Sequence, residues 1–277
     1  MKPFVAILLA ALASAATAET ERIRHLEDNS FLLEEAYNQE VGVVHNITTF
    51  SRDRDTRSWV ATFTQEWPVV EEAHQVAFTV TGSGLRGPGS TRVQGLGDLA
   101  VHYRYQAISD EARTAFAPRV TLLLPTGASR KGLGAGGVGT QVNLPFSMRL
   151  GDHLVSHTNI GGGWTPDGRG TDGSVASYRS LFAGQSLIAL LNYRFNALVE
   201  LLWTGSETTS HGRTARADTL YVSPGLRFGV DVPGGLQIVP GLAVPIGIGP
   251  SASSLSIFGY LSFEFPFSRA AAEHEKG

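Results

Sequence analysis

The chain of 277 residues has no cysteine, and only 17% of its residues are charged, with a formal net charge of -3. Without cysteine, no disulfide framework can hold the fold. The nearly balanced charge, without a run of five basic residues, argues against a nucleic-acid partner. Beyond the N-terminal region no stretch reaches the roughly 18 apolar residues of a membrane-spanning helix. The nearest one, residues 181–203, is interrupted by Gln185, Asn192, Arg194 and Glu200.

The chain does contain 32 glycines and 42% hydrophobic residues, a composition that favours many short strands and turns over a helical enzyme. At the N-terminus, Lys2 precedes an apolar stretch over residues 4–12 and the small-residue pattern Ala16-Thr17-Ala18. This pattern predicts residues 1–18 to be a secretory signal peptide, cleaved after Ala18. If the mature chain then spans a membrane, it must do so with strands, since only helices and closed barrels satisfy their backbone amides in lipid.

From residue 41 onward, segments with strand character alternate with turn signals. Twelve such segments can be counted: 41–50, 57–68, 72–82, 97–107, 114–124, 137–148, 152–163, 180–192, 196–206, 217–229, 234–247 and 253–267. An even count is what single-chain bacterial barrels require. We therefore predict an all-β fold, a single transmembrane antiparallel β-barrel of about twelve strands over residues 41–267, in the bacterial outer membrane.

Apolar and polar residues alternate within the predicted strands, most clearly near the C-terminus. Leu261, Phe263 and Phe265 fall on one face and Ser262 and Glu264 on the other, as expected for a strand with lipid outside and a polar lumen inside. Phe258 and Tyr260 are exceptions on the polar face.

Aromatic residues are also predicted at the two membrane interfaces. Trp59 and Trp67 share a face eight residues apart, which corresponds to about 20 Å along the membrane normal, near the ~25 Å between aromatic girdles. The alternative is a pair of core tryptophans in a soluble sandwich. The predicted interface aromatics are Trp59, Trp67, Phe263, Phe265 and Phe267.

The connections between predicted strands alternate in length. Those at residues 70–71, 108–111, 151, 193–195 and 232–234 are short, as periplasmic turns are. The segments 83–94, 125–136 and 164–178 are long and rich in Gly, Ser, Thr and Asp, and are predicted as outer loops.

Two further segments lie outside the predicted strands. Residues 19–40 are predicted to form a short periplasmic arm, helical or irregular, that either lies across the lumen as a partial plug or hangs free. The tail 268–277 is predicted to be disordered.

Several charged residues are predicted to face the lumen. In a barrel of intermediate width they must pair or stay hydrated. They could form a constriction that sorts solutes by charge, an ion-pair network that stiffens the wall, or both at once. The set is Glu66, Asp98, His102, Arg104, Arg119, His157, Glu200, Arg227 and Glu264.

Three motifs that suggest other chemistry are not supported by their context. The G-x-G-x-x-G pattern at residues 132–137 is followed by period-two alternation and not by the helix that a nucleotide site needs. His153 and His157 are about 13 Å apart on a strand, too far to share a metal ion. Ser156 and His157 point to opposite faces, so they cannot act together as nucleophile and base, although a histidine from another strand could serve Ser156. We expect no cofactor and no metal.

The segment Asn29-Ser30-Phe31-Leu32-Leu33-Glu34-Glu35-Ala36-Tyr37-Asn38-Gln39-Glu40 resembles a family of bacterial outer-membrane barrels described as transporters or as the MetA-pathway of phenol degradation. The motifs 42–45, 95–99 and 124–127 extend the resemblance over most of the mature chain. It implies a channel or uptake protein for small solutes, aromatic or hydrophobic ones among them, and not an enzyme.

The expected partners are outer-membrane lipids, a small-molecule solute and the barrel-assembly machinery. That machinery reads a final aromatic residue, here Phe267, although ten residues follow it. Two alternatives stay open: an outer-membrane hydrolase that acts on lipid through Ser156, and a plugged structural or adhesive barrel without transport.

Overall fold

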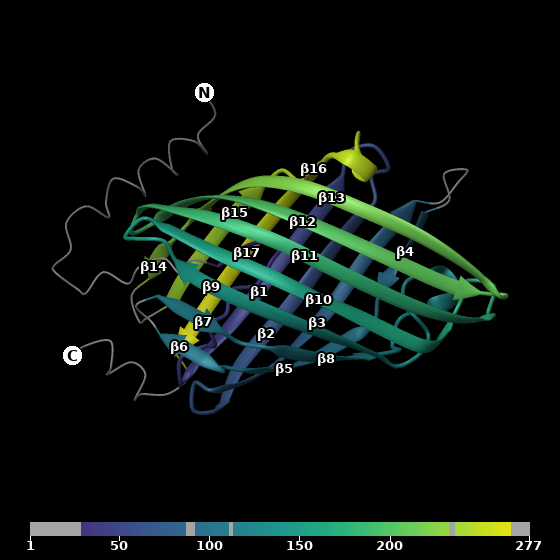
Figure 1. Ribbon diagram of the computed structural model, residues 1–277, viewed down its shortest axis with the longest axis horizontal. Helices are drawn as coiled ribbons and strands as arrows, with labels where there is room; N and C mark the ends of the chain where they lie inside the picture. Colours follow the sequence, from purple (N-terminus) through teal and green to yellow (C-terminus); the bar gives the residue numbers. More distant parts are fainter. Residues whose placement is uncertain (1–28, 87–91, 111–112, 233–235, 267–277) are drawn as a thin grey trace.

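The computed structural model describes residues 29–86, 92–110, 113–232 and 236–266. Within these residues seventeen strand segments form one antiparallel sheet, in which β1 (Val43–Asp53) pairs with β17 (Ser256–Pro266), so the sheet closes on itself (Figure 1). The described residues contain no α-helix, only the short 3-10 turns η3 (Ser129–Lys131) and η4 (Gly249–Ser251). No helix in this part of the chain is long and apolar enough to span a bilayer.

Some segments are interrupted parts of one barrel strand, so the described sheet has twelve strands around its circumference and the predicted twelve-stranded barrel is confirmed. In order these are β1, β2 (Trp59–Val70), β3 (His74–Arg86), β4 (Arg92–Leu96) with β5 (Leu99–Tyr105) and β6 (Ile108–Asp110), β7 (Thr114–Phe116) with β8 (Arg119–Leu124), β9 (Gly139–Arg149), β10 (Leu154–Arg169), β11 (Val175–Asn192), β12 (Phe195–Ser210), β13 (Arg213–Phe228) with β14 (Val230–Val232), β15 (Leu236–Ala243) with β16 (Ile246–Gly247), and β17.

The two faces of the wall follow the alternation in the sequence. In β17, Ile257 and Phe265 are exposed on the outer face, whereas Ser262 and Glu264 are buried on the inner face. Across the barrel the exposed residues include many large aliphatic and aromatic side chains, and the buried ones many polar or charged side chains. This is the reverse of a water-soluble protein and is typical of a membrane-spanning barrel.

The strands β10 to β13 are longer than predicted, at 16 to 18 residues each. The predicted long loop at 164–178 is therefore wrong, because β10 continues to Arg169 and only residues 170–174 connect it to β11. A two-residue turn with positive φ at His211 and Gly212 joins β12 to β13, the geometry of a type I′ hairpin. The polar, Gly- and Thr-rich composition of residues 164–178 is typical of a loop, but it is also compatible with strands that extend beyond the membrane into water.

The other predicted loops differ less from the structure. The strand β3 extends to Arg86 and β4 begins at Arg92, so the connection predicted at 83–94 is shorter, and its centre lies outside the described residues. Residues 125–138 do form a long connection, with η3 inside it.

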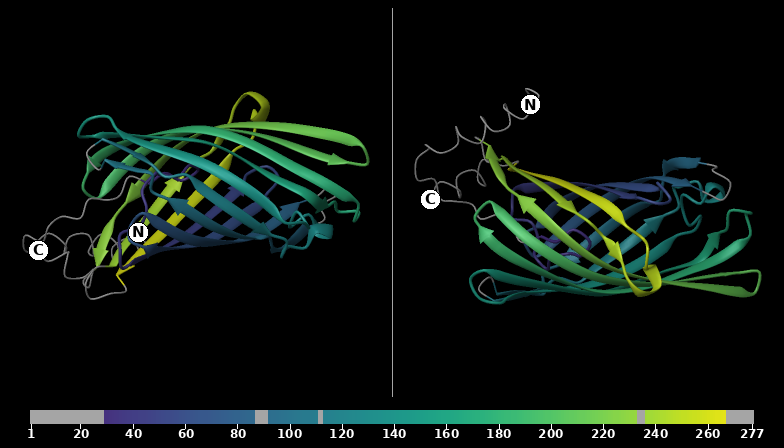
Figure 2. Two further views of the ribbon diagram at one scale, coloured as in Figure 1. Left: turned by 60° about the horizontal axis from the view of Figure 1, so that its bottom comes forward. Right: turned by 90° about the horizontal axis from the view of Figure 1, so that it is seen from above.

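Residues 29–40 precede β1 and form no strand, yet most of them are buried inside the barrel (Figure 2). Phe31 belongs to a buried apolar cluster together with inward-facing wall residues. Its buried partners are Val155, Ile188, Leu198, Val239, Ala243, Phe258 and Tyr260. We call residues 29–40 the lumen segment.

Candidate functional site: the occupied lumen

The lumen segment follows the inner circumference of the wall. Arg227 of β13 donates to the carbonyl oxygen of Asn29 at one end, and at the other end Gln39 N–H donates to Gln75 Oε1 of β3. Between these ends the segment is bound by side chains of β12, β10, β9 and β5 in turn. An extended backbone without secondary structure carries N–H and C=O groups that need partners when buried, and here wall side chains provide them.

Glu200 is the most concentrated of these contacts. Its Oε1 accepts hydrogen bonds from the N–H groups of Phe31, Leu32 and Leu33 at 3.1, 2.9 and 3.1 Å. Three consecutive N–H groups that point at one oxygen form an anion-binding concavity of the kind called a nest. Hydrogen bonds to a charged acceptor are stronger than those between neutral groups. Glu200 thereby fixes the bend of the segment.

Arg104 holds the second half of the segment. Its Nε donates to Asn38 Oδ1 at 2.9 Å, and its two terminal nitrogens donate to the carbonyl oxygens of Glu35 and Tyr37. The Glu35 carboxylate lies 4.0 Å from the same guanidinium. The Gln106 side chain makes two further hydrogen bonds to the segment: it accepts one from Asn38 N–H and donates one to Ala36 O.

The centre of the segment is bound through neutral and charged groups together. Glu34 pairs with Arg119 at 2.6 Å, and Asn159 accepts from Glu34 N–H and donates to Glu34 O. Ser147 Oγ accepts from Ala36 N–H at 2.8 Å and lies 2.6 Å from His157 Nδ1. The Ser147–His157 pair is completely buried, and it supports the segment.

Glycines of the wall leave room for the apolar side chains of the segment. A Cβ atom at Gly241 would lie 2.4 Å from the Phe31 ring, one at Gly225 2.7 Å from it, and one at Gly184 2.5 Å from Leu33. Phe31 also packs on Phe258 and Tyr260, at centroid distances of 5.6 and 5.2 Å. The two aromatics that broke the alternation of β17 therefore form a docking surface for Phe31.

Eight of the nine charged residues predicted for the lumen do face it, and they form two groups. Arg104, Arg119, Glu200 and Arg227 contact the lumen segment directly. The others line the wall nearby: His45 lies 3.6 Å from Glu66 and 4.0 Å from Glu264, His102 bonds Thr79 and Thr121, and His157 bonds Ser147.

Asp98 is the exception among the nine. Its carboxylate accepts from the N–H groups of Gly127 and Ala135 at 2.9 and 2.7 Å. It therefore anchors the connection 125–138 and is not part of the group around the lumen segment.

Charge alone did not identify the neutral contacts. Gln75, Gln106, Ser147 and Asn159 bind the segment as directly as the charged residues do. Their position in the alternating pattern places them on the inner face. Which of them meet the segment depends on the register between strands, and the composition of a single strand carries no information on register.

Ser156 lies on the outer face, where its Oγ accepts from the side-chain amide of Gln185 at 2.7 Å. Its neighbour in the structure is an amide, which cannot serve as a base, so the geometry does not favour a hydrolase at this residue. The described residues contain no group of three or more His, Asp or Glu side chains that could hold a metal ion.

The predicted interface aromatics Trp59, Trp67, Phe263 and Phe265 all point outward. Trp59 stacks on Phe50 at 6.3 Å and Phe263 on Phe265 at 6.4 Å, and Trp67 is exposed. Phe267 lies outside the described residues.

The closed antiparallel wall with apolar residues outside defines the fold class of bacterial outer-membrane β-barrels. No family model matches the chain, and no curated protein matches it. The resemblance to the MetA-pathway family therefore stays a prediction.

Among solved structures, the COG4313 outer membrane channel from Pseudomonas putida F1 is similar, with a TM-score of 0.66 and 14% identity over 83% of this chain and 98% of that chain. The KdgM porin gives 0.48 at 4% identity, over 79% of this chain and 98% of that one. The Pseudomonas putida toluene transporter TodX gives 0.39 at 12%, over 81% and 88%. At 14% identity, the likeness to the COG4313 channel shows the fold alone.

The docking of Phe31 can be tested with a single methyl group. We expect Gly241→Ala to displace Phe31, because no Cβ fits beside its ring, and thereby to speed amide hydrogen exchange at residues 31–33 at least about tenfold. Gly259→Ala is the matched control in β17, because its Cβ would meet nothing closer than 3.9 Å. Equal exchange in both variants would contradict this packing.

The segment should also respond to pH through Glu35. Burial raises the pKa of the Glu35 carboxyl to about 7, with the adjacent Arg104 opposing part of this shift and Glu66 and His45 also nearby. The Glu35 carboxyl therefore stays protonated to a higher pH in the bound segment than in a released one. Binding of the segment is thus strongest below the ordinary pKa of about 4.5 and weakens as the pH rises to about 7.

We expect the protection factors of the amides of residues 31–33 to fall roughly ten- to a hundredfold over this pH range and to level off above it. In Glu35→Gln the decline should become clearly smaller. A decline that persists unchanged in this variant would assign it to another group.

Proposed function

We propose that the protein is an outer-membrane channel for small solutes, in which the lumen segment closes the passage. One observation carries this proposal: the lumen is filled by residues that belong to no strand of the wall. Small eight-stranded barrels are filled by the side chains of their own strands, whereas a wider barrel leaves space. Because the lumen segment continues into β1 but is not a strand of the wall, it can leave the lumen without opening the sheet.

The wall behind the segment supports a hydrated path. The paired positions Ser186, Glu200 and Ser223 form a polar row across β11, β12 and β13. Ser186 Oγ, Glu200 Oε2 and Ser223 Oγ are buried and have no protein hydrogen-bond partner among the described residues. Buried polar atoms of this kind are normally hydrated.

The apolar cluster around Phe31 lies in the same lumen and supports passage of solutes with an apolar part. When Phe31 leaves, the side chains that packed on it, Phe258, Tyr260 and Leu198 among them, become the lining of a passage. The similar fold of a protein described as an outer membrane channel supports the same function. The class of solute we propose is small and partly hydrophobic.

The charged wall has two roles in this proposal. With the segment bound, Arg104, Arg119 and Arg227 hold its carbonyl and carboxylate oxygens. With the segment gone, the same guanidinium groups face the passage together with Glu66 and Glu264, and sort solutes by charge.

The test is deletion of residues 29–39, recorded in planar bilayers. We expect the deletion variant to have a larger mean single-channel conductance than the full chain, since it lacks the filler. The matched control is removal of residues 268–277, which should leave conductance unchanged. A deletion variant that forms a heat-modifiable barrel but conducts no better than lipid alone would refute a channel.

The same recordings test the charged wall. In the deletion variant, Arg104→Ala with Arg227→Ala should shift the reversal potential away from anion preference. An unchanged reversal potential would leave the two arginines with a structural role.

A further inference from the structure

The wall binds the lumen segment mainly through its peptide backbone. The N–H groups of the segment donate to side-chain oxygens of the wall, which belong to Gln75, Gln106, Ser147, Asn159 and Glu200. The carbonyl oxygens of the segment accept from wall side chains, which are Arg104, Gln106, Asn159 and Arg227. Every peptide carries these two groups at each residue, proline apart. The contacts therefore recognise a peptide chain rather than one particular sequence.

Side-chain contacts add selection at three positions of the segment. The apolar side chains of Phe31 and Leu33 each lie against a wall glycine, where a Cβ atom would come within 2.5 Å of them. The Phe31 ring is also enclosed by the apolar cluster described above. The Glu34 carboxylate pairs with Arg119 at 2.6 Å. The wall thus favours an aromatic, an aliphatic and an acidic side chain, in that order along the chain.

The lumen is wide enough for an extended peptide, because it already contains one. Residues 29–39 run from Arg227 of β13 to Gln75 of β3 without helix or strand. When the segment leaves, a space of the same length and cross-section remains between the same side chains. A second peptide chain can therefore enter this space without a rearrangement of the wall.

A peptide matches the vacated wall better than a smaller solute does. An aromatic hydrocarbon fits only the place of the Phe31 ring and leaves Glu200 and Arg104 to water. A peptide also restores the three N–H donors of Glu200 and the carbonyl acceptors of Arg104. Because hydrogen bonds to charged groups are stronger than those between neutral groups, these contacts discriminate between the two classes of solute.

We propose that the vacated lumen binds short, extended peptides that carry an aromatic residue. The proposal rests on the proposed function, in which the segment leaves the lumen, and it names the class of solute for that site. The segment occupies the place of the bound peptide, so the two compete. A peptide that binds only when the segment is out shifts the protein toward the released state.

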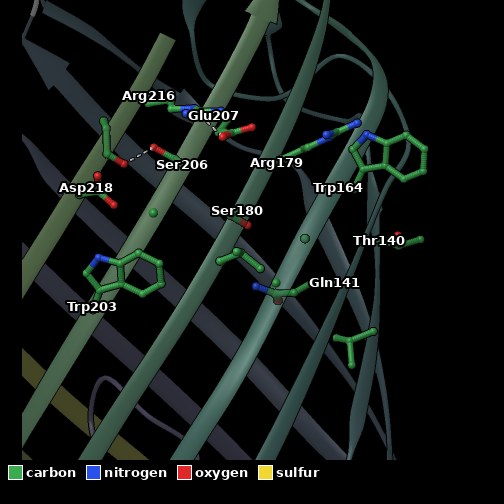
Figure 3. A pocket seen from close by; sticks show the side chains of 16 residues that line it. Thr140, Gln141, Trp164, Arg179, Ser180, Trp203, Ser206, Glu207, Arg216 and Asp218 are labelled. Atoms are coloured by element: carbon green, nitrogen blue, oxygen red, sulfur yellow. Dashed lines mark hydrogen bonds and ion pairs between the residues drawn. The ribbon is translucent and has the colours of Figure 1, made fainter. Parts of the chain in front are cut away.

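The outer face of the same strands supplies a matched control. Glu207 lies further along β12 than Glu200, at a position of opposite parity, and therefore points away from the lumen. It pairs with Arg216 at 2.7 Å on the face that carries Trp164 and Trp203 (Figure 3). A largely exposed ion pair of this kind contributes little to stability. Replacing Glu207 leaves every contact of the lumen segment in place.

Amide hydrogen exchange of residues 31–33 measures the competition in the full chain, reconstituted in lipid vesicles. The probe is the peptide Ala-Phe-Ala-Leu-Glu, acetylated and amidated at its ends. We expect millimolar probe to speed exchange of these amides at least about threefold, since the released state gains population with the ratio of peptide concentration to Kd. The same peptide with N-methyl groups on Phe, the second Ala and Leu lacks the donors that Glu200 binds. It should speed exchange by much less, and so should toluene at equal concentration.

Two variants separate the lumen from the outer face. In Glu200→Ala the advantage of the probe over its N-methylated form should become clearly smaller, whereas in Glu207→Ala it should persist. An unchanged advantage in Glu200→Ala would overturn the proposal. In the unmodified chain, equal acceleration by the probe and either reference compound, or no acceleration by any of them, would also overturn it. The conductance of the variant without residues 29–39 tests the channel separately, so a failure of the peptide site is distinguished from a failure of the channel.

Discussion

The structure depends on one constraint: the backbone of the lumen segment is buried without secondary structure, so the wall must satisfy its hydrogen bonds. Glu200 accepts three N–H groups with one oxygen, and Arg104 donates to two carbonyl oxygens and an amide oxygen. Leaving a buried backbone group without a partner costs about 1–3 kcal/mol. The polar inner wall is therefore the condition under which the segment can occupy the lumen.

The same contacts explain how an occupied lumen is compatible with transport. The contacts of the segment are hydrogen bonds, ion pairs and one aromatic docking surface, and water can replace the polar ones when the segment leaves. The wall itself does not depend on them, because β1 pairs with β17 over all of Val43–Asp53 and with β2 from His45 to Arg52. A closed sheet has no edge to protect, so release of the segment leaves the barrel intact.

The sequence allowed the barrel to be predicted because period-two alternation and turn signals are local. Ser262 and Glu264 inside and Phe263 and Phe265 outside follow from alternation alone. Strand length was harder to predict, since the Thr- and Gly-rich tips of β10 to β13 have the composition of loops. The contacts of the lumen segment could not be predicted, because they depend on the strand register that places Gln75, Ser147 and Asn159 along the path of the segment. The exceptions Phe258 and Tyr260 were the available signal, since aromatic rings on a polar face indicate an apolar partner inside.

The most direct test of the account is a reversible lock between the segment and the wall. The chain has no cysteine, and Ala36 N–H lies 2.8 Å from Ser147 Oγ, so Ala36→Cys with Ser147→Cys adds one pair of thiols at a direct contact. Single-channel recording before and after reduction then follows the same molecules. We expect no openings while the disulfide is closed and openings after reduction, with each single-cysteine variant insensitive to reductant. Identical channel activity in the oxidised and reduced double variant, with the disulfide shown by mass spectrometry to be formed, would contradict it.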